Sequence, residues 1–370
     1  MRVIFAGGGT GGHLFPGIAV AEALRRRFGD AEIRFVGSRK RIEVGILASA
    51  GYELVSIPAA PFSKNPWRWP GFAVRSLAAY HQSLRLVRGL GADLVVALGG
   101  YAAYWPALAA KGRRIPVVAL EQNVIPGKAG RRIAGWAYAT CVQFPGSAEH
   151  FRPKANVVVT GNPVRREVRE TTREQGRARL GLSEKERVVL VVGGSQGSHA
   201  INELVVEALG KLARIEGHFL IHQTGKSDYS RVEGAYQAAG VRGLVGAFFD
   251  EMPAHLAAAD VVVGRAGATG IAEICVRGLP SILIPYPHAA EAHQEANARE
   301  LASRGAAVVL DERKTTSEEF FRELEKLLGD PGRMRRMSEA ARALGIGDAA
   351  ERVVEICAQA VCAGRGGGER

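Results

Sequence analysis

The chain has 370 residues, 47% of them hydrophobic, and carries a formal net charge of +12. This length and apolar content suffice for two domains. The sequence contains no run of about 18 apolar residues, so we expect no membrane-spanning helix. The four cysteines do not have the spacing of metal ligands. The positive charge predicts an anionic partner: a nucleic acid, an acidic membrane surface or a phosphorylated substrate.

Short apolar runs alternate with helical segments along both halves of the chain. In the first half the predicted strands are residues 2–6, 33–36, 54–57, 94–98, 117–120 and 157–160. In the second half they are residues 188–192, 218–222, 244–247, 261–263, 281–284 and 307–310. This alternation predicts an α/β fold with two doubly wound, Rossmann-like parallel sheets.

We expect the first domain to cover residues 1–163 and the second to cover 164–345, each presenting its strand ends to a central cleft. The highly charged segment 165–187 is predicted to be the crossover between them. An amphipathic helix over 346–362 is expected to pack back on the first domain. The glycine-rich, charged tail 363–370 is predicted to be disordered.

The first strand runs into a glycine loop that formally matches a dinucleotide fingerprint at Gly7, Gly9 and Gly12. A true fingerprint needs an acidic residue at the end of the second strand for the ribose, and this strand ends in Gly37-Ser38-Arg39, which argues against a dehydrogenase. His13 follows the loop at a helix start, where an imidazole suits a general base near neutral pH. A capping or substrate-binding histidine is the alternative.

A second glycine loop begins the second half, and Gly193, Ser195 and Gly197 formally match a nucleophile elbow. A hydrolase would then take its histidine from His288 or His293. The neighbouring Gly194, Gln196 and Ser198 make an anion cradle the favoured interpretation.

The stretch 264–297 carries most of the chemistry. Gly264, Gly267 and Gly270 open a helix after a buried strand, and the helix N-terminus at Thr269 suits a phosphate. Glu273 lies one turn deeper, where a carboxylate can accept hydrogen bonds from a ribose diol. His293, Gln294 and Asn297 follow the next strand and could hold sugar hydroxyls. The stretch predicts a nucleotide-sugar site; an ordinary βαβ unit with a solvated Glu273 is the alternative.

Other polar groups end strands of the first half. Tyr101 and Asn123 follow neighbouring strands and are expected to face the same cleft, and Arg165 at the hinge could pair with a phosphate. Each of the three could also be structural.

Aromatic residues gather in the segment 61–90. Trp67, Trp69 and Phe72, flanked by Lys64, Arg68 and Arg75, precede a helix whose apolar face is predicted to be core, with Leu77, Tyr80, Leu84 and Val87. Aromatic side chains beside basic ones favour a membrane interface, and a buried loop is the alternative.

Five motifs occur in order over about residues 1–300: Gly8-Gly9-Thr10-Gly11-Gly12-His13-Leu14-Phe15-Pro16-Gly17, Glu121-Gln122-Asn123, Gly161-Asn162-Pro163-Val164-Arg165, Gly193-Gly194-Ser195-Gln196-Gly197, and Arg265-x-Gly267-Ala268 with Glu273. This set resembles the MurG-type N-acetylglucosaminyltransferases of bacterial peptidoglycan synthesis. The resemblance implies the GT-B architecture, in which two Rossmann-like domains face a cleft.

The resemblance also implies the reaction. Such enzymes transfer GlcNAc from UDP-GlcNAc to the C4 hydroxyl of MurNAc in undecaprenyl-pyrophosphoryl-MurNAc-pentapeptide (lipid I), with inversion, giving lipid II and UDP. It implies a peripheral protein at the cytoplasmic face of the inner cell membrane, on an acidic surface, that serves cell-wall growth, cell shape and division. We expect no cofactor, and no metal because no Asp-x-Asp pair is placed to hold Mg²⁺.

Site residues follow by the same similarity. His13 would be the base. Gly9 and Tyr101 would contact the acceptor, whose pyrophosphate would lie near residues 9–12. Donor contacts would come from Thr10, Gly11, Gly12, Asn123, Arg165, Ser195, Gln196, Phe248, Met252, Arg265, Ala268, Thr269, Glu273, His293, Gln294 and Asn297. Family members usually carry Gln-Gln where this chain has His293-Gln294.

Two competing functions remain open from the sequence. A UDP-GlcNAc 2-epimerase, or another GT-B glycosyltransferase, would bind the same donor; an epimerase would need carboxylates near the sugar C2, and the cleft motifs offer mostly His, Asn and Gln. A nucleic-acid-binding protein would use the +12 charge, but Lys and Arg are spread along the chain without a recognised module, so we expect no nucleic acid partner.

Overall fold

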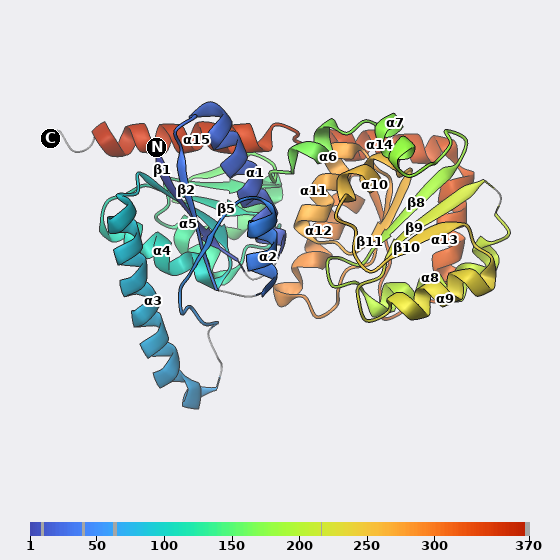
Figure 1. The fold of residues 1–370 in the computed structure, drawn as a ribbon, viewed down its shortest axis with the longest axis horizontal. Helices are drawn as coiled ribbons and strands as arrows, with labels where there is room; N and C mark the ends of the chain where they lie inside the picture. Colours follow the sequence, from blue (N-terminus) through green and yellow to red (C-terminus); the bar gives the residue numbers. More distant parts are fainter. Residues whose placement is uncertain (9–10, 39–40, 62–64, 216, 367–370) are drawn as a thin grey trace. The chain divides into compact units, whose positions relative to one another are not determined.

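The computed structural model describes residues 1–8, 11–38, 41–61, 65–215 and 217–366. The chain divides into two compact units, Met1–Arg165 with Gly347–Arg370 (unit 1) and Arg166–Ile346 (unit 2), each a parallel sheet between helices (Figure 1). The predicted α/β class with two doubly wound sheets is confirmed.

Unit 1 holds a seven-stranded parallel sheet in the order β3-β2-β1-β4-β5-β6-β7. Its strands are β1 (Arg2–Gly7), β2 (Glu32–Gly37), β3 (Leu54–Ser56), β4 (Leu94–Gly99), β5 (Val117–Glu121), β6 (Ala139–Val142) and β7 (Val157–Val159). The sequence analysis missed β6, whose four residues give no apolar run, although all four are buried between β5 and β7.

Alternate residues of β1 enter opposite cores, because side chains of a strand point to opposite faces. Val3 and Phe5 pack with α1 (Gly11–Arg27) and α15 (Ala349–Gly366). Ile4 and Ala6 pack on the other face, against α3 (Trp69–Leu90), α4 (Tyr101–Gly112) and α5 (Lys128–Ala134). The remaining helices of the unit are α2 (Arg41–Ser49) and the 3₁₀ segments η1 (Pro66–Arg68) and η2 (Pro145–His150).

The last helix of the chain, α15, belongs to unit 1. Its Val353, Val354 and Cys357 are fully buried against the sheet, and Arg26 of α1 pairs with Glu351 at 3.4 Å. The helix runs to Gly366, so residues 363–366 are helical and do not belong to the disordered tail that composition predicts. Near the end of the helix, Gly364 lies close to Pro116 of the same unit.

The aromatic segment differs from its prediction. Trp69 and Phe72 lie within α3 rather than before it, since the Asn65 side chain accepts a hydrogen bond from Trp67 N and starts a helical run at Pro66. The N-terminal part of α3 extends beyond the sheet (Figure 1), so Leu77 is 60% exposed while Val87 is buried. The predicted core stripe is therefore wrong at Leu77.

Unit 2 holds a six-stranded parallel sheet in the order β10-β9-β8-β11-β12-β13. Its strands are β8 (Arg187–Val192), β9 (His218–Gln223), β10 (Gly243–Gly246), β11 (Val261–Gly264), β12 (Ser281–Leu283) and β13 (Ala307–Val309). Its helices are α6 (Arg166–Glu170), α7 (Arg173–Arg179), α8 (His199–Leu212), α9 (Tyr229–Ala239), α10 (Met252–Ala258), α11 (Ala268–Arg277), η3 (Ala290–Ala292), α12 (His293–Ala302), α13 (Ser317–Gly329) and α14 (Pro331–Leu344).

Apart from Arg165, the charged crossover segment 165–187 is part of unit 2. Arg277 donates to Thr171 O at 2.8 Å, which fixes the end of α6 to α11. The buried Arg177 of α7 donates to Asp260 Oδ2 at 2.8 Å, just before β11. A buried guanidinium needs such a partner, and these contacts hold α6 and α7 on the body of the unit. Among the described residues, no helix is long and apolar enough to cross a membrane.

Candidate functional site

Each sheet has one point where its strand order reverses: between β1 and β4 in unit 1, and between β8 and β11 in unit 2. Open α/β sheets bind ligands outside the carboxyl ends of the strands at this point. In unit 1 these ends carry the His13 loop and Tyr101. In unit 2 they carry the second glycine loop and Arg265.

His13 is the third residue of α1 and lies half-buried against the end of β4. A Cβ added at Gly99 would lie 2.9 Å from His13 Cδ2 and 3.1 Å from its Nε2, so only glycine allows the imidazole this position. Gly99 has a φ of +102° and Gly100 a φ of +73°, which turn the chain into α4 at Tyr101. The structure thus brings His13 and Tyr101 to the same strand end.

The glycine loop before His13 is backed by a carboxylate that the sequence analysis missed. Glu43 of α2 is fully buried and accepts hydrogen bonds from Ser38 N at 2.9 Å and Ser38 Oγ at 2.7 Å. A Cβ at Gly8 would lie 2.7 Å from Glu43 Oε1. Gly9 and Thr10, both predicted site residues, lie outside the described residues, whereas Gly11 and Gly12 begin α1.

Asn123 is held by the carboxylate at the end of β5. Glu121 Oε1 accepts from Asn123 N at 3.2 Å and from Asn123 Nδ2 at 3.3 Å, and Glu121 Oε2 accepts from Gly127 N at 3.1 Å. Between them, Gln122 Nε2 donates to Leu98 O of β4 at 3.1 Å. Burial raises the pKa of Glu121 from 4.5 to about 7, although its hydrogen bonds act to lower it.

This raised pKa predicts a pH-dependent stability for unit 1. Glu121 keeps its proton in the folded state up to about pH 7 but loses it near 4.5 when unfolded, so its contribution is complete below 4.5 and is lost as pH rises through 7. One pH unit corresponds to about 1.4 kcal/mol, so the free energy of unfolding of the wild type should fall by up to about 3 kcal/mol between pH 4.5 and 8. Glu121→Gln has no carboxyl proton to lose and should not show this fall.

Urea unfolding at several pH values measures this difference, followed by the fluorescence of the four tryptophans, all in unit 1. The exposed Glu149 supplies the control, since Glu149→Gln removes a carboxylate that water already solvates. A wild-type curve parallel to that of Glu121→Gln would mean that the hydrogen bonds keep Glu121 ionised throughout.

Arg165, the last residue of unit 1, lies with its guanidinium carbon 4.7 Å from the centre of the Phe15 ring. Phe15 in turn contacts Gly11, where a Cβ would lie 3.0 Å from the Phe15 ring. Arg165 is therefore beside the first glycine loop, as a cation that stacks on an aromatic face.

In unit 2 the second glycine loop leads into α8, whose N-cap is Ser198. Ser195 and Gln196 are exposed, as an anion cradle requires. Arg265 joins this loop to the neighbouring strands: its Nη2 donates to Ser198 Oγ at 2.6 Å and its Nη1 to Ile284 O at 3.0 Å. Glu312 pairs with the same guanidinium, and the Tyr286 ring lies 5.4 Å from it. The sequence analysis named Ser198 as part of the anion cradle, but its contact with Arg265 is a tertiary contact that the sequence does not reveal.

The helix that follows Arg265 begins where the glycines predicted it. Gly267 is the N-cap of α11, so Ala268 and Thr269 lie at the positive end of the helix dipole. Glu273 is 8% exposed, which contradicts the alternative of a solvated carboxylate. Asn297 of α12 is fully buried and donates from Nδ2 to Ala266 O at 3.1 Å, which fixes the turn into α11.

The segment between β12 and α12 has an unusual backbone. Glu291 and Ala292 both have a φ of +53°, which is costly for residues with a side chain and gathers at functional sites. His293 Nδ1 lies 2.7 Å from Ala290 O, and Gln294 Oε1 accepts from Tyr286 N at 2.9 Å. Both side chains therefore hold this segment in place.

Phe248 and Met252 lie past β10. Phe248 is exposed, Met252 begins α10, and between them Phe249 stacks on His255 with ring centres 4.3 Å apart. Gln223, at the carboxyl end of β9, contacts this segment as well and was missed by the sequence analysis. A polar residue directly after an apolar strand was the signal that could have found it.

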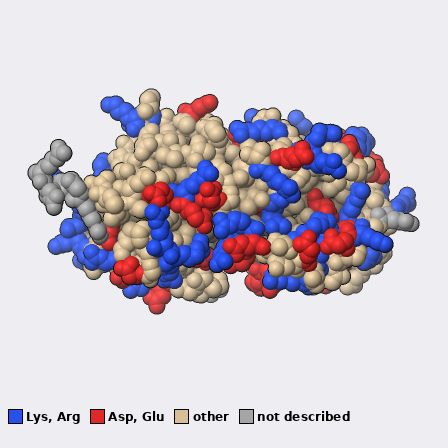
Figure 2. Space-filling view, turned by 90° about the horizontal axis from the view of Figure 1, so that it is seen from above, with Lys and Arg blue, Asp and Glu red and all other residues tan. Residues whose placement is uncertain are grey.

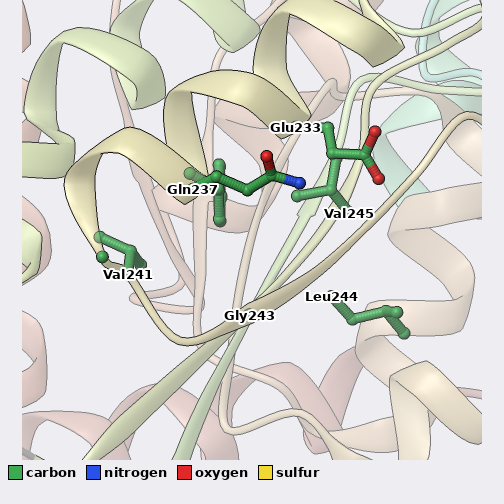
Figure 3. A pocket seen from close by; sticks show the side chains of 8 residues that line it. Glu233, Gln237, Val241, Gly243, Leu244 and Val245 are labelled. Carbon is green, nitrogen blue, oxygen red and sulfur yellow. The ribbon is translucent and has the colours of Figure 1, made fainter.

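A pocket of about 310 Å³ lies elsewhere in unit 2, between α9 and β10, with Glu233 and Gln237 on its helical side (Figure 3). No predicted site residue lines it. Within the described ranges, no group of three or more His, Cys, Asp or Glu side chains is placed to hold a metal ion.

Comparisons with known proteins agree with this arrangement. Residues 3–142 match the glycosyltransferase family 28 N-terminal domain, and residues 188–353 match the glycosyltransferase family 28 C-terminal domain. Each match covers the glycine loop and most of the sheet of one unit. The fold and the two loops thus define a glycosyltransferase built from two Rossmann-like units.

The chain is 37% identical, over 358 residues, to the UDP-N-acetylglucosamine–N-acetylmuramyl-(pentapeptide) pyrophosphoryl-undecaprenol N-acetylglucosamine transferase of Thermodesulfovibrio yellowstonii, covering 96% of this chain and 98% of that one. The crystal structure of Acinetobacter baumannii MurG is similar with a TM-score of 0.77 and 27% identity, over 97% of this chain and 99% of that one. The chain belongs to the MurG-type glycosyltransferases of family 28.

A UDP-GlcNAc 2-epimerase from Neisseria meningitidis bound to UDP-GlcNAc also has this fold, with a TM-score of 0.67 over 97% of this chain and 100% of that one. At 15% identity the likeness concerns the fold alone.

Proposed function

We propose that this enzyme transfers GlcNAc from UDP-GlcNAc to the C4 hydroxyl of MurNAc in undecaprenyl-pyrophosphoryl-MurNAc-pentapeptide, giving lipid II and UDP with inversion at the anomeric carbon. The proposal rests on the similarity, 37% identity over 96% of this chain, to a transferase whose name includes this acceptor. The two strand-end sites, one with a histidine and one with a buried carboxylate behind a helix N-terminus, supply the groups that the reaction needs.

His13 acts as the general base. Inversion is a single displacement: the C4 oxygen forms a bond to the anomeric carbon as the bond to UDP breaks, and the hydroxyl proton passes to the imidazole. No covalent nucleophile is required. Tyr101 and Asn123 hold the acceptor sugars near this base, and the loop of residues 9–12 holds the acceptor pyrophosphate.

Donor binding belongs mainly to unit 2. The leaving diphosphate gains negative charge, which the α11 N-terminus at Ala268 and Thr269 and the Arg265 guanidinium stabilise. Ser195 and Gln196 contact the same diphosphate, and Glu273 accepts from the ribose hydroxyls. Uracil lies by Phe248 and the backbone before Met252. The GlcNAc hydroxyls meet His293, Gln294 and Asn297.

UDP release from UDP-GlcNAc, with and without a short-chain polyprenyl-pyrophosphoryl-MurNAc-pentapeptide, tests this function. We expect release only with acceptor, together with a GlcNAc–MurNAc disaccharide product. Formation of UDP-ManNAc without acceptor would identify an epimerase instead. Binding of UDP-GlcNAc without any product would keep the donor site and overturn the acceptor assignment.

We further propose that the enzyme binds peripherally to the cytoplasmic face of the acidic cell membrane through η1 and the start of α3. Trp67 is 92% exposed, Trp69 is also exposed, and the partly buried Phe72 and the exposed Arg75 follow in α3. Exposed aromatic rings with a basic neighbour favour the interface of an anionic bilayer.

Replacing Trp67, Trp69 and Phe72 by Ser should lower binding to anionic vesicles by about tenfold or more, because each aromatic ring contributes apolar burial in the bilayer. Activity on a soluble acceptor should survive. Vesicle sedimentation measures the binding, with Tyr138→Ser/Val159→Ser, two other partly exposed apolar residues of unit 1, as the matched control. Equal loss in the control, or unfolding of the triple variant, would contradict a specific membrane surface.

The charge of +12 is better explained by phosphorylated substrates and an acidic bilayer than by nucleic acid. On the face shown in Figure 2, Lys and Arg are interspersed with Asp and Glu and form no stripe. A nucleic-acid backbone would call for such a stripe.

A further inference from the structure

We propose that Gln223 is a positioning residue that couples the uracil-binding segment, residues 246–249, to the diphosphate-binding loop, residues 193–198, and thereby sets the preference for a uridine nucleotide. This inference rests on the donor site of the proposed function.

The amide of Gln223 contacts both segments at once. Gln223 is the last residue of β9 and is 2% exposed. Its Nε2 donates to Gly194 O at 3.0 Å, and its Oε1 accepts from Phe249 N at 2.9 Å. One planar group therefore fixes the distance between the two backbones.

The residues after Gln223 continue this contact along the backbone. Thr224 N donates to Gly246 O at 3.0 Å, and Gly225 N donates to Ala247 O at 3.1 Å. On the other side, Gly225 lies against Gln196 O and Gly197 lies against Thr224 O, so closely that a Cβ at either glycine would overlap the opposite carbonyl. The segment 223–225 thus lies between the two donor-binding segments and contacts each of them.

The same segment is held from behind by a buried polar network. Asn202 of α8 is fully buried, and its Nδ2 donates to Thr224 O at 2.9 Å and to Asp228 Oδ2 at 2.7 Å. His222 Nε2 lies 3.0 Å from Asn202 Oδ1, and its Nδ1 lies 3.1 Å from the Tyr236 hydroxyl. Burial lowers the pKa of His222 to about 3, so the neutral ring donates from Nε2 and accepts at Nδ1.

Because the buried network holds residues 223–225 in place, Gln223 can keep the base-binding segment at a fixed distance from the diphosphate-binding loop. Uracil and cytosine differ at the base edge: uracil offers N3–H and O4, whereas cytosine offers N3 and an amino group. Backbone groups of residues 246–249 can distinguish the two bases only if they are held in register with the diphosphate bound one loop away. Without the Gln223 amide, the two segments lose the pair of hydrogen bonds, to Gly194 O and from Phe249 N, that joins them through one side chain.

The test measures binding of UDP and CDP to the full-length protein by calorimetry, without acceptor. Gln223→Met keeps the side-chain length but removes both hydrogen bonds, so UDP should bind about 10- to 100-fold more weakly. The ratio of the CDP and UDP dissociation constants should fall at least about fivefold, because two lost backbone contacts relax the base-reading segment. Gln223→Asn, which is too short to reach both partners, should lower the ratio as well.

A matched control lies at the other end of the same strand. His218 is the first residue of β9, is 7% exposed, and its Nε2 lies 3.0 Å from Leu212 O. His218→Met removes a comparable buried contact and should lower the melting temperature without changing the CDP/UDP ratio.

The outcomes separate the two proposals. If wild-type protein does not bind UDP, the donor site and this inference both fall. Suppose that wild type binds UDP and that both Gln223 variants fold and keep its affinity and CDP/UDP ratio within about twofold. Such a change is smaller than the contribution of one hydrogen bond, so only the inference falls. If both Gln223 variants unfold while His218→Met folds, Gln223 is structural and the inference is again overturned.

Discussion

Replacing His13 by Gln should lower turnover by about 10²–10⁴-fold, the usual contribution of a positioned general base. That range corresponds to about 3–5 kcal/mol of transition-state free energy. Glutamine keeps the approximate size and a polar end but cannot take the proton of the C4 hydroxyl. The KM for UDP-GlcNAc should change little, because the donor contacts lie mainly in unit 2.

Steady-state rates with a soluble lipid acceptor measure this effect. The exposed His150 of unit 1 supplies the control, since His150→Gln removes an imidazole that is not among the predicted site residues. A loss of less than about tenfold would be too small for a general base and would assign His13 to substrate binding.

Replacing Glu273 by Ala should raise the KM for UDP-GlcNAc by about 10- to 100-fold, because a hydrogen bond to a charged group contributes about 1.5–3 kcal/mol. Turnover at saturation should change much less. Glu273 is buried in α11 one turn behind the helix start, so its carboxylate is held without the mobility of a surface side chain.

A donor lacking the ribose hydroxyls sharpens this experiment. The deoxy donor should raise the KM for wild type by about as much as Glu273→Ala raises it for UDP-GlcNAc, and the two changes together should cost little more than either alone, because they remove one shared contact. Glu295→Ala, in the exposed ion pair with Arg299 of the same unit, is the control. Additive effects would place the ribose elsewhere.

Most of the fold could be predicted from the sequence, since parallel strands buried on both faces are visible as apolar runs such as residues 94–98 and 188–192. The strand β6 could not, because Ala-Thr-Cys-Val owes its burial to its neighbours and not to its own hydrophobicity. Leu77 was assigned to a core by its helical spacing, but spacing does not reveal that the start of α3 extends past the sheet.

The candidate site divides in the same way. Glycine loops and helix starts have local signatures, so His13, Ser195 and Thr269 could be found from the sequence. The contacts of Gln223 and Glu43 could not be derived in this way, although Gln223 stands directly after an apolar run, because they depend on partners that are distant in sequence or on a close backbone approach. The buried position of Asn297 under Ala266 O is likewise a tertiary contact that spacing does not reveal.

The assignment of α15 to unit 1 has a consequence for how the protein is made. A ribosome completes the chain from residue 1 onward, and unit 2 ends at Ile346, before α15 has been synthesised. Unit 2 therefore has all of its residues while unit 1, although begun first, still lacks the helix that buries Val353, Val354 and Cys357 against its sheet. The domain whose synthesis starts first is the last to gain a complete core, because the part of its apolar sheet face that α15 covers stays exposed until that helix has been made.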